Sequence, residues 1–216
     1  EQCQLRLISK RWIGGCKVVD LTKLHFEQYR EDRLKEVKSG TVKAELTLMQ
    51  RVFKTAIKEW GYGILLNPVA NIELPKSAKP RTRRLVANEL SVLISNAEKQ
   101  KNKYISTIIQ FAVETGMRRS EILKLTWNDV NLDTGIASLY DTKNGDDRHI
   151  PLTKTAIQLL SNLTQSSEFV FPISANCLRL AWERCRNKSN IKGLRFHDLR
   201  HEAVSRFFEM GLSVPE

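Results

Sequence analysis

The hydrophobic positions along the chain predict mostly helices. From residue 41 to residue 60, apolar side chains recur at alternating steps of four and three, the spacing of one buried helix face. Thr41 is suited to cap the start of this helix, and Gly61 is suited to end it. A weaker helical pattern covers residues 21–35. The buried stripe of the stronger helix is expected to consist of Val42, Leu46, Met49, Phe53, Ile57 and Trp60.

Helical spacing returns in the second half of the chain. Residues 88–99 and 103–115 are predicted as helices, and Gly116 suits the position just after a helix end. Two further helices are expected at about residues 175–188 and 197–210.

One segment alternates between apolar and polar positions instead. Residues 136–142 and 148–152 read as two strands around Asn144-Gly145, a pair that is typical of a two-residue hairpin turn. Thr153 is placed to cap the helix that follows. The predicted fold class is therefore mainly α with a small β-hairpin or sheet (α+β).

A polar stretch with two prolines and many cations interrupts these patterns. Residues 75–84 are predicted as a basic linker between a helical domain at 1–74 and a second domain at 85–216. Its composition fits a solvated connector and a phosphate-binding segment equally well. The cations that could contact phosphates are Lys76, Lys79, Arg81, Arg83 and Arg84.

Composition narrows the partners. The 216 residues carry a formal net charge of +11, which favours an anionic partner but also fits a generically basic protein. No apolar run approaches the roughly 20 residues that a membrane span needs, so no membrane partner is expected. The four cysteines form two distant pairs rather than a disulfide framework, which indicates a reducing cytoplasm.

The last predicted helix carries a basic face. His197, Arg200 and His201 lie at positions i, i+3 and i+4, and a bound phosphate would offset their repulsion. For this motif alone, a solvated basic face is the more frequent explanation. The two histidines have the spacing of zinc ligands, but no C-x2-C pair accompanies them, so no metal is expected.

Two other positions could carry chemistry. Arg118 falls at the start of a short helix after Gly116, where Glu121 could hold it; the alternative is a surface ion pair of little worth. Lys143 directly precedes the hairpin turn and would matter only if the tip placed its ammonium near a leaving group. The sequence has no Walker-type glycine loop and no carboxylate cluster for two metals, so no cofactor is expected.

The order of these motifs resembles a known family. Thr-Gly-Met-Arg-x-Ser-Glu, then Thr-Lys-Asn-Gly with Arg148-His149-Ile150-Pro151-Leu152, then His-Asp-Leu-Arg-His is similar to tyrosine recombinases, especially phage, plasmid and shufflon-type integrases. The resemblance covers the chain from about residue 20 onward. It implies a helical core-binding domain followed by the recombinase catalytic domain.

The resemblance also implies a mechanism. In this family a tyrosine hydroxyl attacks the scissile phosphate, giving a 3′-phosphotyrosine and a free 5′-hydroxyl without metal or nucleotide. Arg118 and Arg200 would bind the non-bridging oxygens, and Lys143 would protonate the leaving oxygen. His197 would hydrogen-bond the phosphate or assist proton movement at the nucleophile.

Two residues receive supporting roles from the resemblance. Glu121 matches a carboxylate that holds the first arginine, and His201 matches the second histidine of the family motif.

The chain departs from the family pattern at its ends. The family continues past Gly-Leu-Ser-Val-Pro to a Leu-Gly-His-type motif and then to the nucleophilic tyrosine. The resemblance therefore implies a fragment that is incomplete at both ends, without the nucleophile, and inactive in strand cleavage. The chain's own tyrosines all precede the His-Asp-Leu-Arg-His motif, and none matches the nucleophile: Tyr29, Tyr62, Tyr104 and Tyr140.

The expected partners are duplex DNA and other protomers, which would form a tetrameric synapse in the full-length enzyme, in the cytoplasm of a bacterial or phage-host cell. One alternative is a non-catalytic DNA-binding accessory or regulatory protein with the same fold. Another is a basic helical protein that binds RNA or protein. The DNA site and the direction of the reaction have no signature in the sequence.

Overall fold

A computed structural model of the chain describes residues 1–61, 63, 66–79, 81–140 and 147–212. The chain divides into two compact units, Glu1–Arg81 and Thr82–Glu216. Each unit has a hydrophobic core of its own. The division falls inside the segment that the sequence predicts as a linker.

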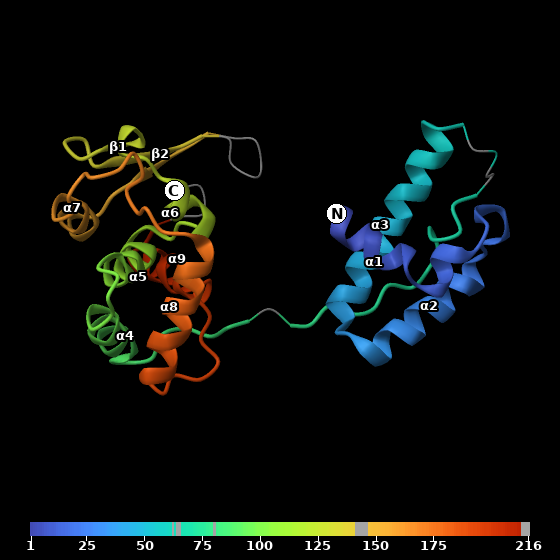
Figure 1. Ribbon diagram of the computed structural model, residues 1–216, viewed down its shortest axis with the longest axis horizontal. Coiled ribbons are helices and arrows are strands. Elements are labelled where there is room, and N and C mark those ends of the chain that lie inside the picture. The colour runs from blue at the N-terminus through green and yellow to red at the C-terminus, as the bar shows by residue number, and fades with distance from the viewer. Residues whose placement is uncertain (62, 64–65, 80, 141–146, 213–216) are drawn as a thin grey trace. The chain divides into compact units, whose positions relative to one another are not determined.

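The first unit is helical (Figure 1). Its elements are α1 (Gln2–Ser9), the 3₁₀ helices η1 (Trp12–Gly15) and η2 (Val18–Asp20), α2 (Lys23–Glu36) and α3 (Ser39–Lys58). Helix α3 packs on α1 and α2. Phe26 of α2 meets Phe53 of α3 edge to face, with ring centroids 5.6 Å apart, which is a favoured aromatic geometry.

Helix α3 corrects two details of the prediction. It begins at Ser39 with Lys38 as its N-cap, so Thr41 lies inside the first turn and does not cap the helix. Trp60, expected in the buried stripe, is 60% exposed. The helix has already ended at Lys58, so helical geometry no longer directs the Trp60 side chain inward. Val42, Leu46, Met49 and Phe53 are buried as predicted.

The second unit combines six helices and a small sheet among its described residues. The helices are α4 (Glu89–Glu98), α5 (Tyr104–Thr115), α6 (Arg119–Lys124), α7 (Lys154–Ser161), α8 (Ala175–Lys188) and α9 (Asp198–Glu209). A 3₁₀ turn, η3 (Trp127–Asp129), leads into the strands β1 (Val130–Asn131), β2 (Ile136–Leu139) and β3 (Arg148–Pro151). These elements confirm the mainly α fold class with a small sheet.

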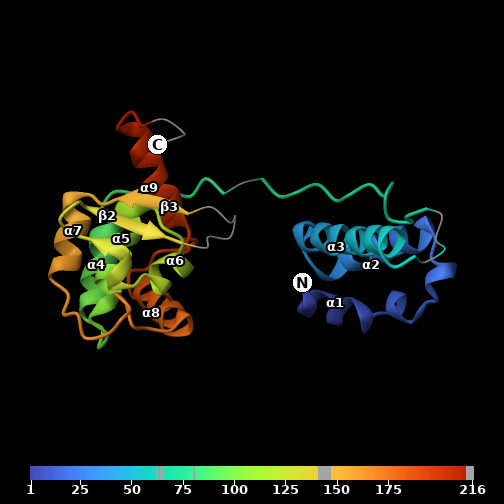
Figure 2. The same cartoon turned by 90° about the horizontal axis from the view of Figure 1, so that it is seen from above.

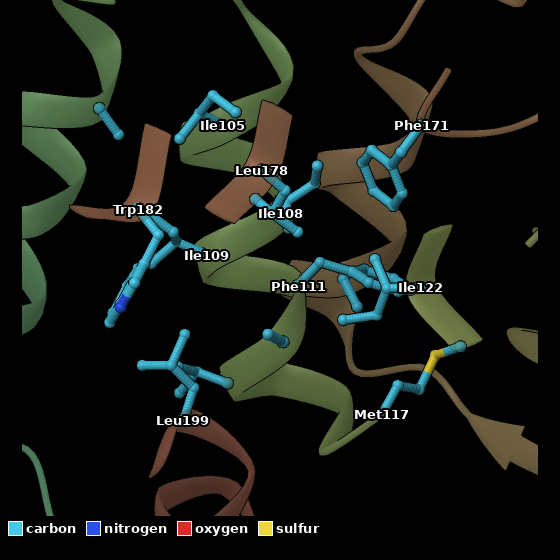
Figure 3. Close-up of a cluster of buried hydrophobic side chains, with 14 of the residues drawn as sticks. Ile105, Ile108, Ile109, Phe111, Met117, Ile122, Phe171, Leu178, Trp182 and Leu199 are labelled. Atoms are coloured by element: carbon cyan, nitrogen blue, oxygen red, sulfur yellow. The ribbon is translucent and has the colours of Figure 1, made fainter. Parts of the chain in front are cut away.

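Helix α5 forms the centre of this unit. It contacts α4, α6, α7, α8 and α9, and more than half of its residues are buried. Figure 3 shows its Ile109 near Leu199 of α9 and Trp182 of α8, and its Phe111 near Ile122 of α6. The core therefore joins α6 and α9, the two helices that carry the predicted site.

The three strands form an antiparallel sheet in the order β1-β2-β3. Strand β2 pairs with β3 from Ile136↔Pro151 to Leu139↔Arg148. The sheet covers one end of the helical group (Figures 1 and 2). The predicted turn at Asn144-Gly145 lies outside the described residues. Thr153 caps α7 as predicted, because its side-chain oxygen accepts a hydrogen bond from the Ala156 backbone N–H at 3.1 Å.

Candidate active site

The site is built around the turn that ends helix α5. Gly116 has φ 62°, a left-handed conformation that favours glycine, and a Cβ there would lie 3.4 Å from the Cβ of Ala203 on α9. Met117 is buried and anchors the next position. The prediction that Gly116 ends the helix is confirmed. The turn delivers Arg118 to the start of α6, close to α9.

Glu121 holds Arg118 by two hydrogen bonds. The backbone N–H of Arg118 donates to Oε2 of Glu121 at 2.7 Å, and its Nη1 donates to Oε1 at 2.7 Å. The Glu121 side chain is only 13% exposed. Charge-assisted hydrogen bonds of this length to a mostly buried carboxylate are stronger than an exposed surface pair.

Arg148 reaches the same carboxylate from the sheet. Its Nη2 donates to Oε2 of Glu121 at 2.7 Å. Its Nε is buried and finds no hydrogen-bond partner among the described residues. Arg148 is the first residue of β3, so the strand and the Arg118 turn share one carboxylate.

Arg200 approaches the turn from α9. Its Nη1 donates to the backbone carbonyl of Gly116, two residues before Arg118. Burial, together with the positive charges of Arg118 and Arg148, lowers the pKa of Arg200, while Glu121 opposes that effect. Arg200 thus contacts the turn that positions Arg118, and Arg118 shares Glu121 with Arg148.

The charge of the site is unbalanced. Burial alone would raise the pKa of Glu121, but hydrogen bonds from Arg118 and the charge of Arg148 hold that pKa below its ordinary value. Glu121 is therefore an anion near neutral pH. Arg118 and Arg148 share this carboxylate and Arg200 contacts the same turn, so the site carries an excess of positive charge that suits an oxyanion.

The histidines lie at the start of α9. His197 is the N-cap residue, and its ring meets that of His201 edge to face, with centroids 5.0 Å apart. Partial burial of the ring lowers the pKa of His197, and the charges of His201 and Arg200 add to the effect. His197 is thus neutral over a wider pH range than an isolated histidine, so it can accept a hydrogen bond or a proton.

A hollow of about 660 Å³ borders the arginines. Arg148, Arg200 and the Gly116 backbone line one part of it, and apolar side chains at the end of α9 line another part. Arg148 and Arg200 therefore border open space instead of a packed interior.

The cations of the predicted linker divide between the two units. Lys76, Lys79 and Arg81 belong to the first unit and are exposed. Arg83 and Arg84 belong to the second unit, where Arg83 forms an ion pair with Glu89 of α4.

Arg84 contacts two carboxylates of α9. Its Nε lies 3.1 Å from Oε2 of Glu202, and its Nη2 lies 3.3 Å from Oε2 of Glu209. Nε of Arg206 donates to Glu202 at 2.9 Å, as does the backbone N–H of Leu85 at 3.2 Å. Arg84 thus ties the start of the second unit to the helix that carries Arg200.

The described residues do not include every predicted site residue. Lys143, the proposed general acid, lies outside the described residues. Among the described residues, no group of three or more His, Cys, Asp or Glu side chains could hold a metal ion. None of the described helices is long and apolar enough to cross a membrane.

A sequence comparison decides the family. The model of the phage integrase family matches residues 83–216, more than half of the chain. The chain belongs to the phage integrase family. This is the tyrosine recombinase family that the motifs resemble, so that prediction is confirmed.

Two relatives of this integrase-family chain cover most of it. The shufflon-specific DNA recombinase of Escherichia coli is 37% identical over 97% of the chain. A putative integrase/recombinase of Haemophilus influenzae is 34% identical over 88% of it. The chain spans 57% and 64%, respectively, of the lengths of these relatives.

Solved integrase structures share the fold. A lambda integrase dimer bound to a COC′ core site superposes with a TM-score of 0.79 at 22% identity, covering 98% of this chain and 82% of that chain. A lambda integrase tetramer bound to a Holliday junction gives a TM-score of 0.77 at 22% identity, covering 99% and 67%.

The structure brings together most of the predicted site of this integrase-family chain. Arg118, Glu121 and Arg200 meet at the Gly116 turn, and His197 stands beside His201. Sequence reasoning missed Arg148 as a site residue. Arg148 stands in the Arg148–Leu152 part of the motif, but at the start of a strand after a hairpin an arginine is ordinarily solvated, so no role was assigned to it.

Proposed function

We propose that the chain is the DNA-handling part of a site-specific DNA recombinase, which cuts and rejoins DNA strands through a 3′-phosphotyrosine intermediate. One observation carries the proposal: Arg118 and Arg200, far apart in the sequence, converge on the Gly116 turn with an excess of positive charge. The names of the recombinase relatives supply the reaction class.

The two arginines suit a phosphoryl-transfer step. A phosphodiester gains negative charge on its non-bridging oxygens as a nucleophile attacks it. Guanidinium groups that are already held in place stabilise this charge without reorganisation during the reaction. Glu121 and the Gly116 carbonyl restrain Arg118 and Arg200, respectively, in this way.

Proton transfer falls to two other residues. His197, with its lowered pKa, is proposed to hydrogen-bond the phosphate or to help remove the proton from the attacking tyrosine hydroxyl. Lys143 is proposed to give a proton to the leaving 5′-oxygen. His201 is proposed to support His197.

The nucleophile is not assigned to a residue of this chain. No tyrosine follows the His-Asp-Leu-Arg-His motif in the 216 residues. The Tyr29 hydroxyl donates to Glu45 in the core of the first unit, and burial raises the pKa of Tyr29. The role proposed for Arg118 and Arg200 is therefore to bind the phosphate and to stabilise its negative charge.

Duplex DNA and further protomers are the proposed partners. Exposed Lys76, Lys79 and Arg81 in the first unit are proposed to contact DNA phosphates. Arg83 and Arg84 pair with carboxylates within the second unit, and they are proposed to contact phosphates as well. In the full-length enzyme, four protomers would assemble on two duplexes in the cytoplasm of a bacterial or phage-host cell.

The proposal is tested by DNA binding across a salt series. Duplexes enriched from a random pool by binding to the wild-type chain serve as probes for Arg118→Gln and Arg200→Gln. Each substitution should weaken binding and reduce the slope of log affinity against log salt by about 1, because one phosphate contact is lost. Lys154→Gln is the charge-matched control on α7 and should leave the slope near that of wild type.

Two outcomes would contradict the proposal. Unchanged slopes for both arginine variants would leave a DNA-binding accessory protein as the better explanation. A preference for duplex RNA over duplex DNA in direct competition would favour the RNA-binding alternative.

A further inference from the structure

We infer that Arg148 is a positioning residue of the phosphate site, which holds Glu121 and, through it, the guanidinium of Arg118. The inference rests on the proposed function, since it assigns a role within the same site. It concerns a residue at which the motif comparison placed no chemistry.

Glu121 is shared between Arg118 and Arg148. Oε1 of Glu121 accepts from Nη1 of Arg118, while Oε2 accepts from the Arg118 backbone N–H and from Nη2 of Arg148. Glu121 is thus held from α6 on one side and from β3 on the other. A carboxylate with partners on both sides loses the rotation that would release Arg118 from its orientation.

Arg148 also changes the net charge of the site. Glu121 and Arg118 alone would form a neutral pair, and a neutral pair attracts a phosphate weakly. Arg148 adds a second positive charge beside Glu121, and this charge also lowers the pKa of Arg200. The cluster of Arg118, Arg148 and Glu121 therefore carries a net positive charge. Arg148 can therefore satisfy Glu121 while Arg118 keeps its capacity for an incoming oxyanion.

The sheet gives Arg148 a fixed base. Arg148 pairs with Leu139 in the β2–β3 ladder, and Leu139 is buried against the core. The Nε of Arg148 is buried and its side chain as a whole is 33% exposed, so it does not extend freely into water. A lysine here could reach one acceptor as a point charge but would lack the planar fork of arginine.

The test uses the 216-residue chain and inorganic phosphate as the probe. The Nε–H signals of Arg118 and Arg200 are followed by ¹⁵N NMR as phosphate is added. Arg148→Gln and Arg148→Lys are compared with Arg184→Gln, a matched loss of one exposed arginine on α8 that contacts no residue of the site. Arg200→Gln reports on the phosphate site itself.

Arg148→Gln should weaken phosphate binding about tenfold, since one charge-assisted interaction is lost. Arg148→Lys should recover part of that loss, and Arg184→Gln should stay within about twofold of wild type. The Arg118 signal should also move in Arg148→Gln before any phosphate is added, but not in Arg184→Gln. That shift would report the changed environment of the Arg118 guanidinium directly.

The outcomes separate this inference from the proposed function. If Arg200→Gln weakens phosphate binding while Arg148→Gln matches Arg184→Gln, the role of Arg148 is overturned and the site stands. If Arg200→Gln also has no effect, or wild type binds no phosphate, the proposed function and the inference fail together. Should Arg148→Gln not fold, wild-type affinity in Arg148→Lys overturns the inference alone.

Discussion

The two units each contain a carboxylate that binds arginine, and the two clusters differ in burial and in charge. In the first unit, Glu45 accepts two hydrogen bonds from Arg33, at 2.9 and 2.6 Å, and one from the Tyr29 hydroxyl at 2.9 Å. Nη1 of Arg33 also donates to Glu36, which pairs with Arg11. Two arginines thus meet two glutamates.

In the second unit, Glu121 accepts hydrogen bonds from Arg118 and Arg148, and Arg200 pairs with no carboxylate among the described residues. The side chains of Arg33 and Glu45 are 8% and 7% exposed, whereas those of Arg118 and Arg148 are 36% and 33% exposed. The buried and balanced Arg33–Glu45 pair holds α2 and α3 together. An unbalanced cluster beside open space is suited to bind an anion.

The largest effect is expected from breaking the balanced cluster. Glu45→Ala leaves Arg33 and Tyr29 without their buried acceptor and should reduce the free energy of unfolding of the first unit by about 3–5 kcal/mol. Hydrogen exchange of the α2 and α3 amides measures this loss, and the α5 amides in the second unit serve as an internal reference.

Glu31→Ala is the matched control on α2, the helix that carries Arg33 and Tyr29. Glu31 forms an exposed pair with Arg30, so its loss should change stability by no more than about 0.5 kcal/mol. Similar protection in both variants would show that the buried cluster does not stabilise the unit.

A smaller effect is expected at Glu202, a balanced contact inside the second unit. Burial alone would raise the pKa of Glu202, but Arg84 and Arg206 hold it below its ordinary value. The unfolded chain then binds more protons in acid. The stabilisation is complete above the ordinary carboxyl pKa of 4.5 and is lost as the pH falls through the lower folded value.

Glu202→Gln should therefore cost about 1–3 kcal/mol at neutral pH and should flatten the acid limb of the stability curve. Urea unfolding at a series of pH values measures both effects. Glu183→Gln removes an exposed pair with Arg179 and should change neither. An acid limb as steep as that of wild type would show that ionised Glu202 does not stabilise the second unit.

The smallest expected effect is a shift in the titration of His197. Arg200 is one of the charges that lower the pKa of His197, so Arg200→Gln should raise that pKa. The ring signals of His197 in a pH titration by NMR report the change, with Arg184→Gln as the charge-matched control. An unchanged or lower pKa would mean that Arg200 and His197 do not share one electrostatic site.

Local patterns predicted most of the helices and strands. Gly116 ends α5, Thr153 caps α7, and α8 spans residues 175–188, because each of these features depends on residues within one or two turns. The errors in α3 are local too: its first and last turns differ from the capping pattern at Thr41 and Trp60. Helix α1 and the two-residue strand β1 had no recognisable pattern.

The pairing of charged residues could not be predicted in the same way. Arg148 meets Glu121, and Arg84 meets Glu202, only because the fold joins distant segments. In the sequence, each of these residues fits a solvated surface equally well. Arg118 and Arg200 were predicted from the order of motifs, and the structure adds that both contact the Gly116 turn and its neighbours.

A crystal structure of the chain with tungstate, a heavy tetrahedral oxyanion, tests the central contrast most directly. We predict tungstate density in contact with Arg118 and Arg200, and none at the Arg33 and Glu45 cluster. A site that stays empty beside Arg118 and Arg200, while tungstate occupies other basic surfaces of the same crystal, would contradict this prediction.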